Sequence, residues 1–163
     1  MKVGLVIDDR ISRPGGVQEY VLGLYDFLES KGHQPIIFTS GRYSQKQKKG
    51  RKIVSFARTF GLGGKKGISL TLGQGETIKR VLRREKPEIL HVQGVPGPLG
   101  LGFLVYSRSV NIMTFHVAHE RVLDDFLAKS LSPVWKRMEE SLQGKIAISK
   151  VAAAYVQKFC PGP

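Results

Sequence analysis

Residues 2–18 read KVGLVIDDRISRPGGVQ, and this stretch decides the fold class. Lys2–Asp8 is a short apolar run ended by acidic residues, which predicts a buried strand. The glycine-containing loop Arg13–Gln18 follows it. A helix is predicted for Gly16–Lys31, with Gly32 as its C-cap, because apolar residues recur there at helical spacing: Val17, Tyr20, Val21, Leu24 and Leu28. Strand, loop and helix in this order are typical of the first unit of a parallel α/β sheet.

The rest of the chain repeats the alternation of strands and helices. Further strands are predicted at Pro35–Thr39, Ile53–Phe56, Glu88–Val92, Asn111–Phe115 and Lys145–Ile148. Helices are predicted at Gly75–Lys86, Glu120–Leu142 with an interruption near Pro133, and Val151–Phe159. This order predicts a doubly wound, mainly parallel, Rossmann-like α/β sheet with helices on both faces. A length of 163 residues suits one such domain, spanning 1–163.

The cysteine content and the lengths of the apolar runs indicate the cellular compartment of the protein. The single cysteine, Cys160, cannot form an internal disulfide, and no Cys/His cluster has zinc-ligand spacing, so we expect a reducing, cytoplasmic setting and no metal. The apolar start is too short for a signal peptide or a membrane span. Gly94–Tyr106 is apolar but is broken by glycine and proline, so no transmembrane helix is expected there.

The formal net charge of +13 is concentrated in one third of the chain. No acidic residue occurs between Arg42 and Gly75, and the next helix adds Lys79, Arg80, Arg83, Arg84 and Lys86 on one side, opposite Ile78, Val81 and Leu82. Such a side is either a solvated face or a surface for anionic lipid. Nucleic acid is disfavoured as a partner, because no aromatic residues are interleaved with the basic run.

Pro14, Gly15 and Gly16 stand in the first strand–helix loop, where open α/β sheets bind ligands. Glycines there let a phosphate or sugar approach the backbone, although Pro-Gly-Gly also makes an ordinary tight turn. The Gly-x-Gly-x-x-Gly fingerprint is missing after the first strand, and the second strand does not end in an acid. Dinucleotide binding is therefore disfavoured.

Several motifs together carry a family resemblance. Met1–Val6, Arg13–Gln18, Lys31–His33, Thr114–His116 and Gly144–Ser149 occur in the order and spacing found in family-four retaining glycosyltransferases of the GT-B fold, which this chain resembles. The resemblance implies the N-terminal, acceptor-side domain of such an enzyme. It implies that a C-terminal donor-binding domain lies outside this chain, and that the 163 residues alone have little or no transferase activity.

The resemblance also implies roles for individual residues. Gly15 and Gly16 would contact the diphosphate and sugar of a nucleotide-sugar donor, and His116 would be the catalytic residue facing the cleft, with His⁺ adding charge complementarity near neutral pH. The acceptor would be bound by four residues: Asp9, Gln18, His119 and Arg121. The membrane would be bound by Lys79, Arg80, Arg83 and Arg84.

The implied partners are a nucleotide sugar, a lipid or glycolipid acceptor, an anionic membrane surface and the C-terminal domain. No cofactor is expected, and the protein would lie peripherally on the inner face of the membrane.

The sequence differs from the inositol-lipid members of the family at Asp9 and at His91–Gly94. These two differences argue against an inositol-lipid acceptor. Two alternatives stay open: a non-enzymatic basic domain that binds nucleic acid or membrane, and an inverting transferase. A nucleotide-sugar epimerase is disfavoured, because the glycine fingerprint and a Tyr-x-x-x-Lys pair are both missing.

Overall fold

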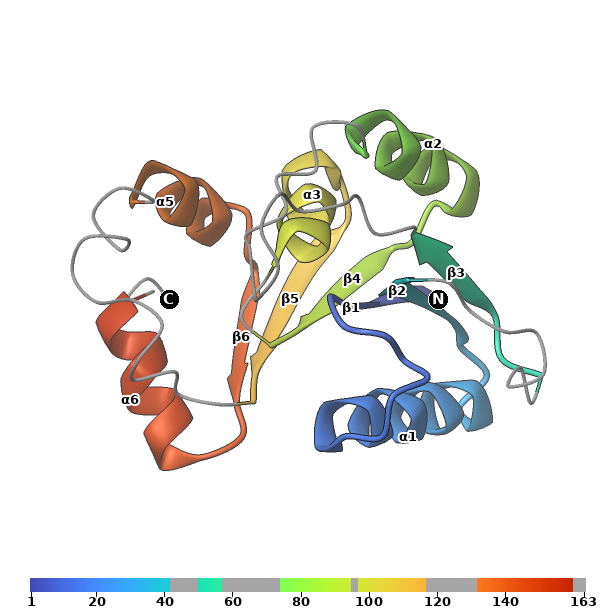
Figure 1. Ribbon diagram of the computed structural model, residues 1–163, viewed down its shortest axis with the longest axis horizontal. Helices are drawn as coiled ribbons and strands as arrows, with labels where there is room; N and C mark the ends of the chain where they lie inside the picture. The colour runs from blue at the N-terminus through green and yellow to red at the C-terminus, as the bar shows by residue number, and fades with distance from the viewer. Residues whose placement is uncertain (42–49, 57–73, 95–96, 117–131, 160–163) are drawn as a thin grey trace.

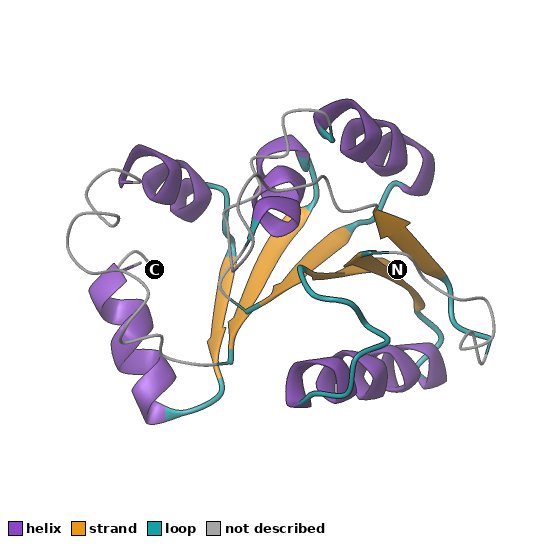
Figure 2. Ribbon diagram, in the orientation of Figure 1, coloured by secondary structure: helices purple, strands orange, loops and turns teal. Residues whose placement is uncertain are grey.

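A computed structural model describes residues 1–41, 50–56, 74–94, 97–116 and 132–159. In these ranges six parallel strands form a sheet with the order β3-β2-β1-β4-β5-β6 (Figures 1 and 2). The strands are β1 Lys2–Ile7, β2 Gln34–Ser40, β3 Ile53–Phe56, β4 Ile89–Gln93, β5 Val110–Phe115 and β6 Gly144–Ala147. The helices are α1 Gly16–Ser30, α2 Gly75–Glu85, α3 Pro98–Tyr106, α5 Ser132–Glu140 and α6 Lys150–Phe159. The predicted doubly wound, mainly parallel sheet is confirmed.

Helices cover both faces of the sheet. Figure 1 shows α2, α3 and α5 on one face and α1 on the other, and Ala152 of α6 belongs to the hydrophobic cluster of the first face. Successive strand residues point to opposite faces, and the core accordingly forms two clusters. One contains Phe38 stacked on Phe103 of α3, with ring centroids 4.7 Å apart. The other contains Leu5 of β1 and Tyr25 of α1. The strand order reverses between β2 and β4 on either side of β1, so the β1–α1 loop lies at a topological switch point.

Helix α3 was not predicted from the sequence. It starts at Pro98, and its buried residues include Leu99, Phe103 and Leu104. A helix that is apolar on most sides has no polar face and so no amphipathic periodicity, which hid it in the apolar stretch before β5. Gly102 lets α3 pack closely on α2, because a Cβ at this position would lie 2.6 Å from Cδ1 of Ile78 in α2.

The predicted boundaries mostly agree with the structure. In α1 the C-cap is Lys31, one position earlier than the predicted Gly32, and Gly32 follows it in the left-handed conformation with φ 77°. Pro133 lies in the first turn of α5, where a proline is tolerated, and does not interrupt a described helix. The earlier part of the predicted helix, 120–131, lies outside the described residues. Among the described helices, none has both the length and the apolar character that a membrane crossing requires.

Candidate functional site

The first turn of α1 is open to a ligand. Gly15 is the N-cap residue in an extended conformation, and no side chain caps the helix. Gly16 is exposed, and a Cβ built on it would meet nothing within 4 Å. The N–H groups of a first helical turn have no partner inside the helix, and the helix dipole is positive there. The structure therefore gives this loop the features of an anion-binding helix N-terminus. The role of Gly15 and Gly16 toward a donor stays a prediction.

The N-terminus of α3 is closed by Asp8, a residue that sequence analysis considered only as the end of a strand. Its carboxylate accepts hydrogen bonds from the backbone N–H groups of Gly97, Leu99 and Gly100, at 2.9, 2.8 and 3.1 Å. Burial raises the pKa of Asp8, and these three hydrogen bonds act in the opposite direction. Two helix N-termini lie at the same edge of the sheet, and one of them holds a carboxylate from the protein itself.

Asp9 and Gln18, both predicted to bind the acceptor, lie next to each other. The amide Nε2 of Gln18 is 3.4 Å from Oδ2 of Asp9, and Oδ1 of Asp9 accepts a hydrogen bond of 2.7 Å from the backbone N–H of Arg10. Gln18 is buried. A Cβ on Gly15 would clash with Oε1 of Gln18, so the glycine leaves room for this side chain. The two side chains thus brace the loop against α1, and their contact with an acceptor stays a prediction.

A row of polar side chains runs along β4 and β5 on the face that carries α1. Leu90, Val92, Met113 and Phe115 belong to the core on the opposite face, so the alternate residues His91, Gln93, Thr114 and His116 point toward the α1 side. Nε2 of His91 lies 2.7 Å from Oγ1 of Thr114, and Nε2 of His116 lies 2.9 Å from Oε1 of Gln93. Gln93 was not among the predicted site residues.

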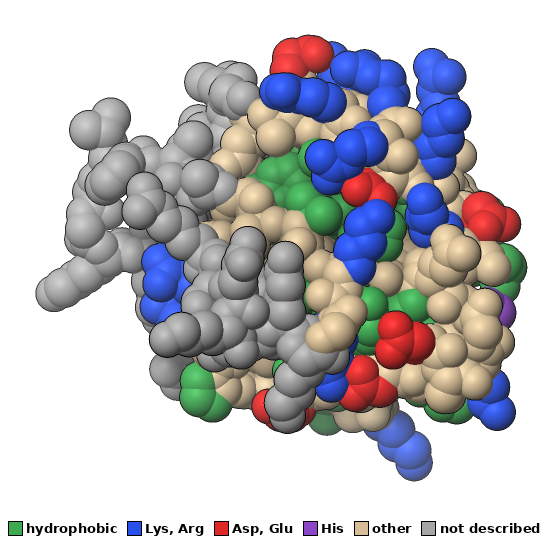
Figure 3. All heavy atoms as spheres, turned by 90° about the vertical axis from the view of Figure 1, so that its right-hand side faces the viewer, with side chains coloured by type: hydrophobic (Ala, Val, Ile, Leu, Met, Phe, Trp, Pro, Cys, Tyr) green, Lys and Arg blue, Asp and Glu red, His purple; other side chains and the backbone are tan. Residues whose placement is uncertain are grey.

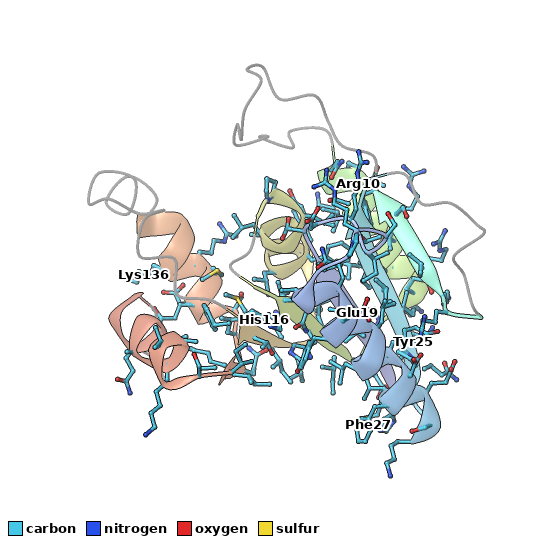
Figure 4. All side chains as sticks on the ribbon, turned by 60° about the horizontal axis from the view of Figure 1, so that its bottom comes forward. Arg10, Glu19, Tyr25, Phe27, His116 and Lys136 are labelled. Atoms are coloured by element: carbon cyan, nitrogen blue, oxygen red, sulfur yellow. The ribbon has the colours of Figure 1, made fainter. Side chains whose placement is uncertain are left out.

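His116 lies beside the start of α1. Its ring meets that of Tyr20 edge to face, with centroids 4.9 Å apart and an interplanar angle of 74°. Tyr20 and Gly16 are four residues apart and so share one face of the helix. Figure 4 shows His116 between α1 and the C-terminal helices. The structure therefore brings the predicted catalytic histidine and the predicted glycine loop to the same edge of the sheet.

Burial favours the neutral form of both histidines. It lowers the pKa of His116, and it lowers the pKa of His91 to about 4, with the charge of His116 as a second, smaller cause. Desolvation disfavours the imidazolium form of His116, which weighs against the expected cationic role near neutral pH, and that role stays a prediction. The other two predicted acceptor residues, His119 and Arg121, lie outside the described residues.

The basic side of α2 is partly neutralised within the helix itself. Nζ of Lys79 is 2.7 Å from Oε1 of Glu76 and 4.8 Å from the centre of the Tyr106 ring, and Nε of Arg84 is 2.9 Å from Oε1 of Glu85. Acidic residues of the same helix thus pair with Lys79 and Arg84. Two exposed residues, Arg80 and Arg83, make no ion pair in the described part of the chain. Figure 3 shows Lys and Arg side chains gathered at the top of the molecule, over α2.

A parallel Rossmann-like sheet with an open helix N-terminus and a histidine at its carboxyl edge is an arrangement suited to a nucleotide-dependent transferase domain. The family described as Glycosyltransferase Family 4 matches residues 14–163. The chain belongs to this family.

Relatives and solved structures agree with this membership. The chain is 30% identical over 164 aligned positions to the phosphatidyl-myo-inositol mannosyltransferase of Propionibacterium freudenreichii subsp. shermanii, an alignment that covers 94% of the chain and 42% of the relative. A glycosyltransferase from Rickettsia africae ESF-5 superposes with a TM-score of 0.64 at 16% identity, covering 99% of the chain and 40% of that structure. The UDP-GlcNAc 2-epimerase of Methanocaldococcus jannaschii superposes with a TM-score of 0.60 at 15% identity, covering 97% and 42%. These two structures show the shared fold.

The chain spans less than half the length of these proteins. The missing glycine fingerprint disfavours nicotinamide-type epimerases, whereas a UDP-GlcNAc 2-epimerase shares the fold of this chain.

Proposed function

We propose that this chain is the acceptor-side domain of a retaining glycosyltransferase that moves a sugar from a nucleotide-sugar donor to a lipid or glycolipid acceptor. The observation that carries the proposal is the open N-terminus of α1 at Gly16, with His116 against Tyr20, which lies one helical turn further along α1. The exposed N–H groups suit the diphosphate of a donor, and a neutral imidazole suits a sugar hydroxyl. Family membership and the mannosyltransferase relative support the reaction class.

The reaction would depend on positioning and charge stabilisation. Donor hydrogen bonds already fixed at the start of α1 would stabilise the negative charge that develops on the leaving diphosphate. A second domain would complete the donor site, and the 163 residues alone would have little or no turnover. No cofactor or metal is required of this half in the proposed scheme.

A lipid acceptor is supported by the name of the 30% identical relative and by the surface of α2. Arg80, Arg83 and Arg84 are exposed along one helix whose residues Ile78 and Val81 are buried against the core. A cation near an anionic membrane contributes about 1 kcal/mol. We propose that this face holds the protein peripherally at the cytoplasmic leaflet, where a lipid acceptor would reach the site.

Two glycines of the same helix give a matched test of the donor site. Gly16 and Gly23 both lie in α1, are exposed, and have open space where a Cβ would stand. Alanine at either position should therefore be accommodated by the fold. We expect Gly16→Ala to raise the KM for the nucleotide sugar at least about 10-fold in the full-length gene product, because the added methyl keeps the diphosphate from the backbone. Gly23→Ala should leave it unchanged.

The assay combines a panel of UDP- and GDP-sugars with a membrane lipid extract, and the anomeric configuration of the product is determined. Equal KM values for the two alanine variants would remove the α1 N-terminus from the donor site. Conversion of the sugar nucleotide into an epimer without an acceptor would refute the transferase and support the epimerase alternative. An inverted product would refute retention.

A further inference from the structure

Gln93 is a buried amide with only one of its two ends in use. It is the last residue of β4 and is only 3% exposed. Its Oε1 lies 2.9 Å from Nε2 of His116. Its own Nε2 is buried, and in the described structure that nitrogen has no hydrogen-bond partner. Buried amide donors are nearly always paired, because an unpaired one keeps the cost of losing water. The described residues therefore leave this buried donor for a group that they do not supply.

The contact between Gln93 and His116 determines how the imidazole is protonated. A carbonyl oxygen can only accept a hydrogen bond, so Nε2 of His116 carries the hydrogen. A neutral imidazole has one N–H and one lone pair, and the lone pair is then on Nδ1. His91 differs, because its partner is the hydroxyl of Thr114, which can donate or accept. Only the Gln93 contact selects a tautomer.

The pair therefore presents one unused acceptor, Nδ1 of His116, and one unused donor group, the NH₂ of Gln93. Phosphate oxygens only accept hydrogen bonds, so a phosphate matches the amide but not Nδ1. Sugar hydroxyls both donate and accept, and a single sugar ring carries several of them. The combination favours a hydroxyl-rich ligand over an anionic one at this point of the site.

We propose that Gln93 is a positioning residue that fixes the Nε2–H tautomer of His116, so that Nδ1 accepts a hydrogen bond from a sugar hydroxyl while the amide of Gln93 donates to another oxygen of the same sugar. The proposal rests on the proposed function for the identity of the ligand. The tautomer itself does not depend on that function. Gln93 thus joins His116 as the part of the site that recognises the sugar, and the start of α1 recognises the charged group.

The tautomer can be measured directly. In ¹⁵N-histidine-labelled full-length protein, long-range ¹H–¹⁵N correlation spectra distinguish Nε2–H from Nδ1–H, and the His116 signal is identified by its loss in His116→Gln. We expect Nε2–H in the wild type and in Gln93→Glu, whose carboxylate also accepts. Gln93→Leu should lose the preference. An Nδ1–H tautomer in the wild type would overturn the proposal, because Gln93 would then be donating to the ring.

Kinetics supply a second, separate readout. The titratable groups around His116 are Tyr20 on α1 and His91 on β4, which both stay in place in the Gln93 variants. Gln93→Leu should lower kcat/KM at least about 10-fold, because the variant loses one hydrogen bond to the sugar and the fixed position of the imidazole. In Gln93→Glu the carboxylate favours the imidazolium, so the acidic limb of the pH profile should move to higher pH.

Asn111→Leu is the matched control, because it removes the hydrogen bond that another buried amide, at the opposite end of β5, donates to the backbone carbonyl of Ser141, and it leaves Gln93 and His116 paired. It should keep the His116 tautomer and keep kcat/KM within about twofold, since the hydrogen bond that it removes does not involve His116. Unchanged kcat/KM and pH profile in both Gln93 variants would overturn the positioning role while leaving the transferase proposal standing. A wild-type protein without transferase activity would overturn the proposed function, and the tautomer measurement would still decide the role of Gln93.

Discussion

His91 should make the protein lose stability in mild acid. Burial lowers the pKa of His91 from 6.5 to about 4 in the folded state, whereas the unfolded chain keeps the ordinary value. Between these two values the unfolded state binds more protons, so the free energy of unfolding falls as the pH falls. One pKa unit corresponds to about 1.4 kcal/mol, and going from pH 7 to pH 4 should therefore cost about 3 kcal/mol from His91 alone. That is a large part of the 5–15 kcal/mol typical of a domain.

Urea unfolding at pH 7, 6, 5 and 4 measures this contribution. His91→Gln cannot titrate and keeps an amide that can reach Thr114, so its free energy of unfolding should fall by about 3 kcal/mol less than that of the wild type over the same range. His33→Gln is the control, because His33 lies just past the end of α1 and its backbone N–H bonds to Leu28. It should show the full wild-type loss. Parallel pH curves for the wild type and His91→Gln would refute the reasoning.

Two further predictions concern the core and the basic face. Gly4→Ala should destabilise the protein by about 1–3 kcal/mol in urea unfolding, because the new Cβ would lie 2.7 Å from Cε2 of Phe38 and 3.1 Å from Cδ1 of Leu90. Gly23→Ala, in open space on α1, should instead stabilise it slightly, and a loss from both would point to a general intolerance of alanine. Arg80→Gln with Arg83→Gln should weaken binding to phosphatidylglycerol vesicles about 30-fold at low salt, at about 1 kcal/mol per cation. The exposed α5 pair Lys136→Gln with Arg137→Gln should change binding less than twofold, and equal effects of both pairs would mean that only net charge matters.

Local patterns predicted the sheet well because its strands are short apolar runs ended by polar or turn residues. β1, β2, β3 and β5 appear close to their predicted positions, and the helical spacing of α1 and α2 is confirmed. Helix α3 could not be found in this way, because its burial removes the polar side that produces a periodic pattern. Its proline and glycines, which argue against a helix in isolation, fit a first turn and a close helix contact.

The site was predictable only in part. The position of Gly15 and Gly16 follows from chain order, since the first loop of a parallel sheet lies at its carboxyl edge. The pairing of Gln93 with His116 depends instead on strand register, which places Gln93 opposite Thr114 across β4 and β5. No pattern within either segment contains that information. The ion pair of Glu76 with Lys79 could be predicted from the sequence, because residues three apart on a helix are neighbours.

The carboxylate of Asp8 at the start of α3 acts as a resident anion. Any phosphate that approached α3 would have to displace three hydrogen bonds and the charge of Asp8, whereas α1 has no side-chain cap and carries Glu19 as the acidic residue of its first turn. The protein thus closes one of two similar helix ends with its own side chain and leaves the other uncapped. A charged ligand is directed to one docking point by exclusion from the other, and a carboxamide at position 8 would remove the charge that makes this distinction.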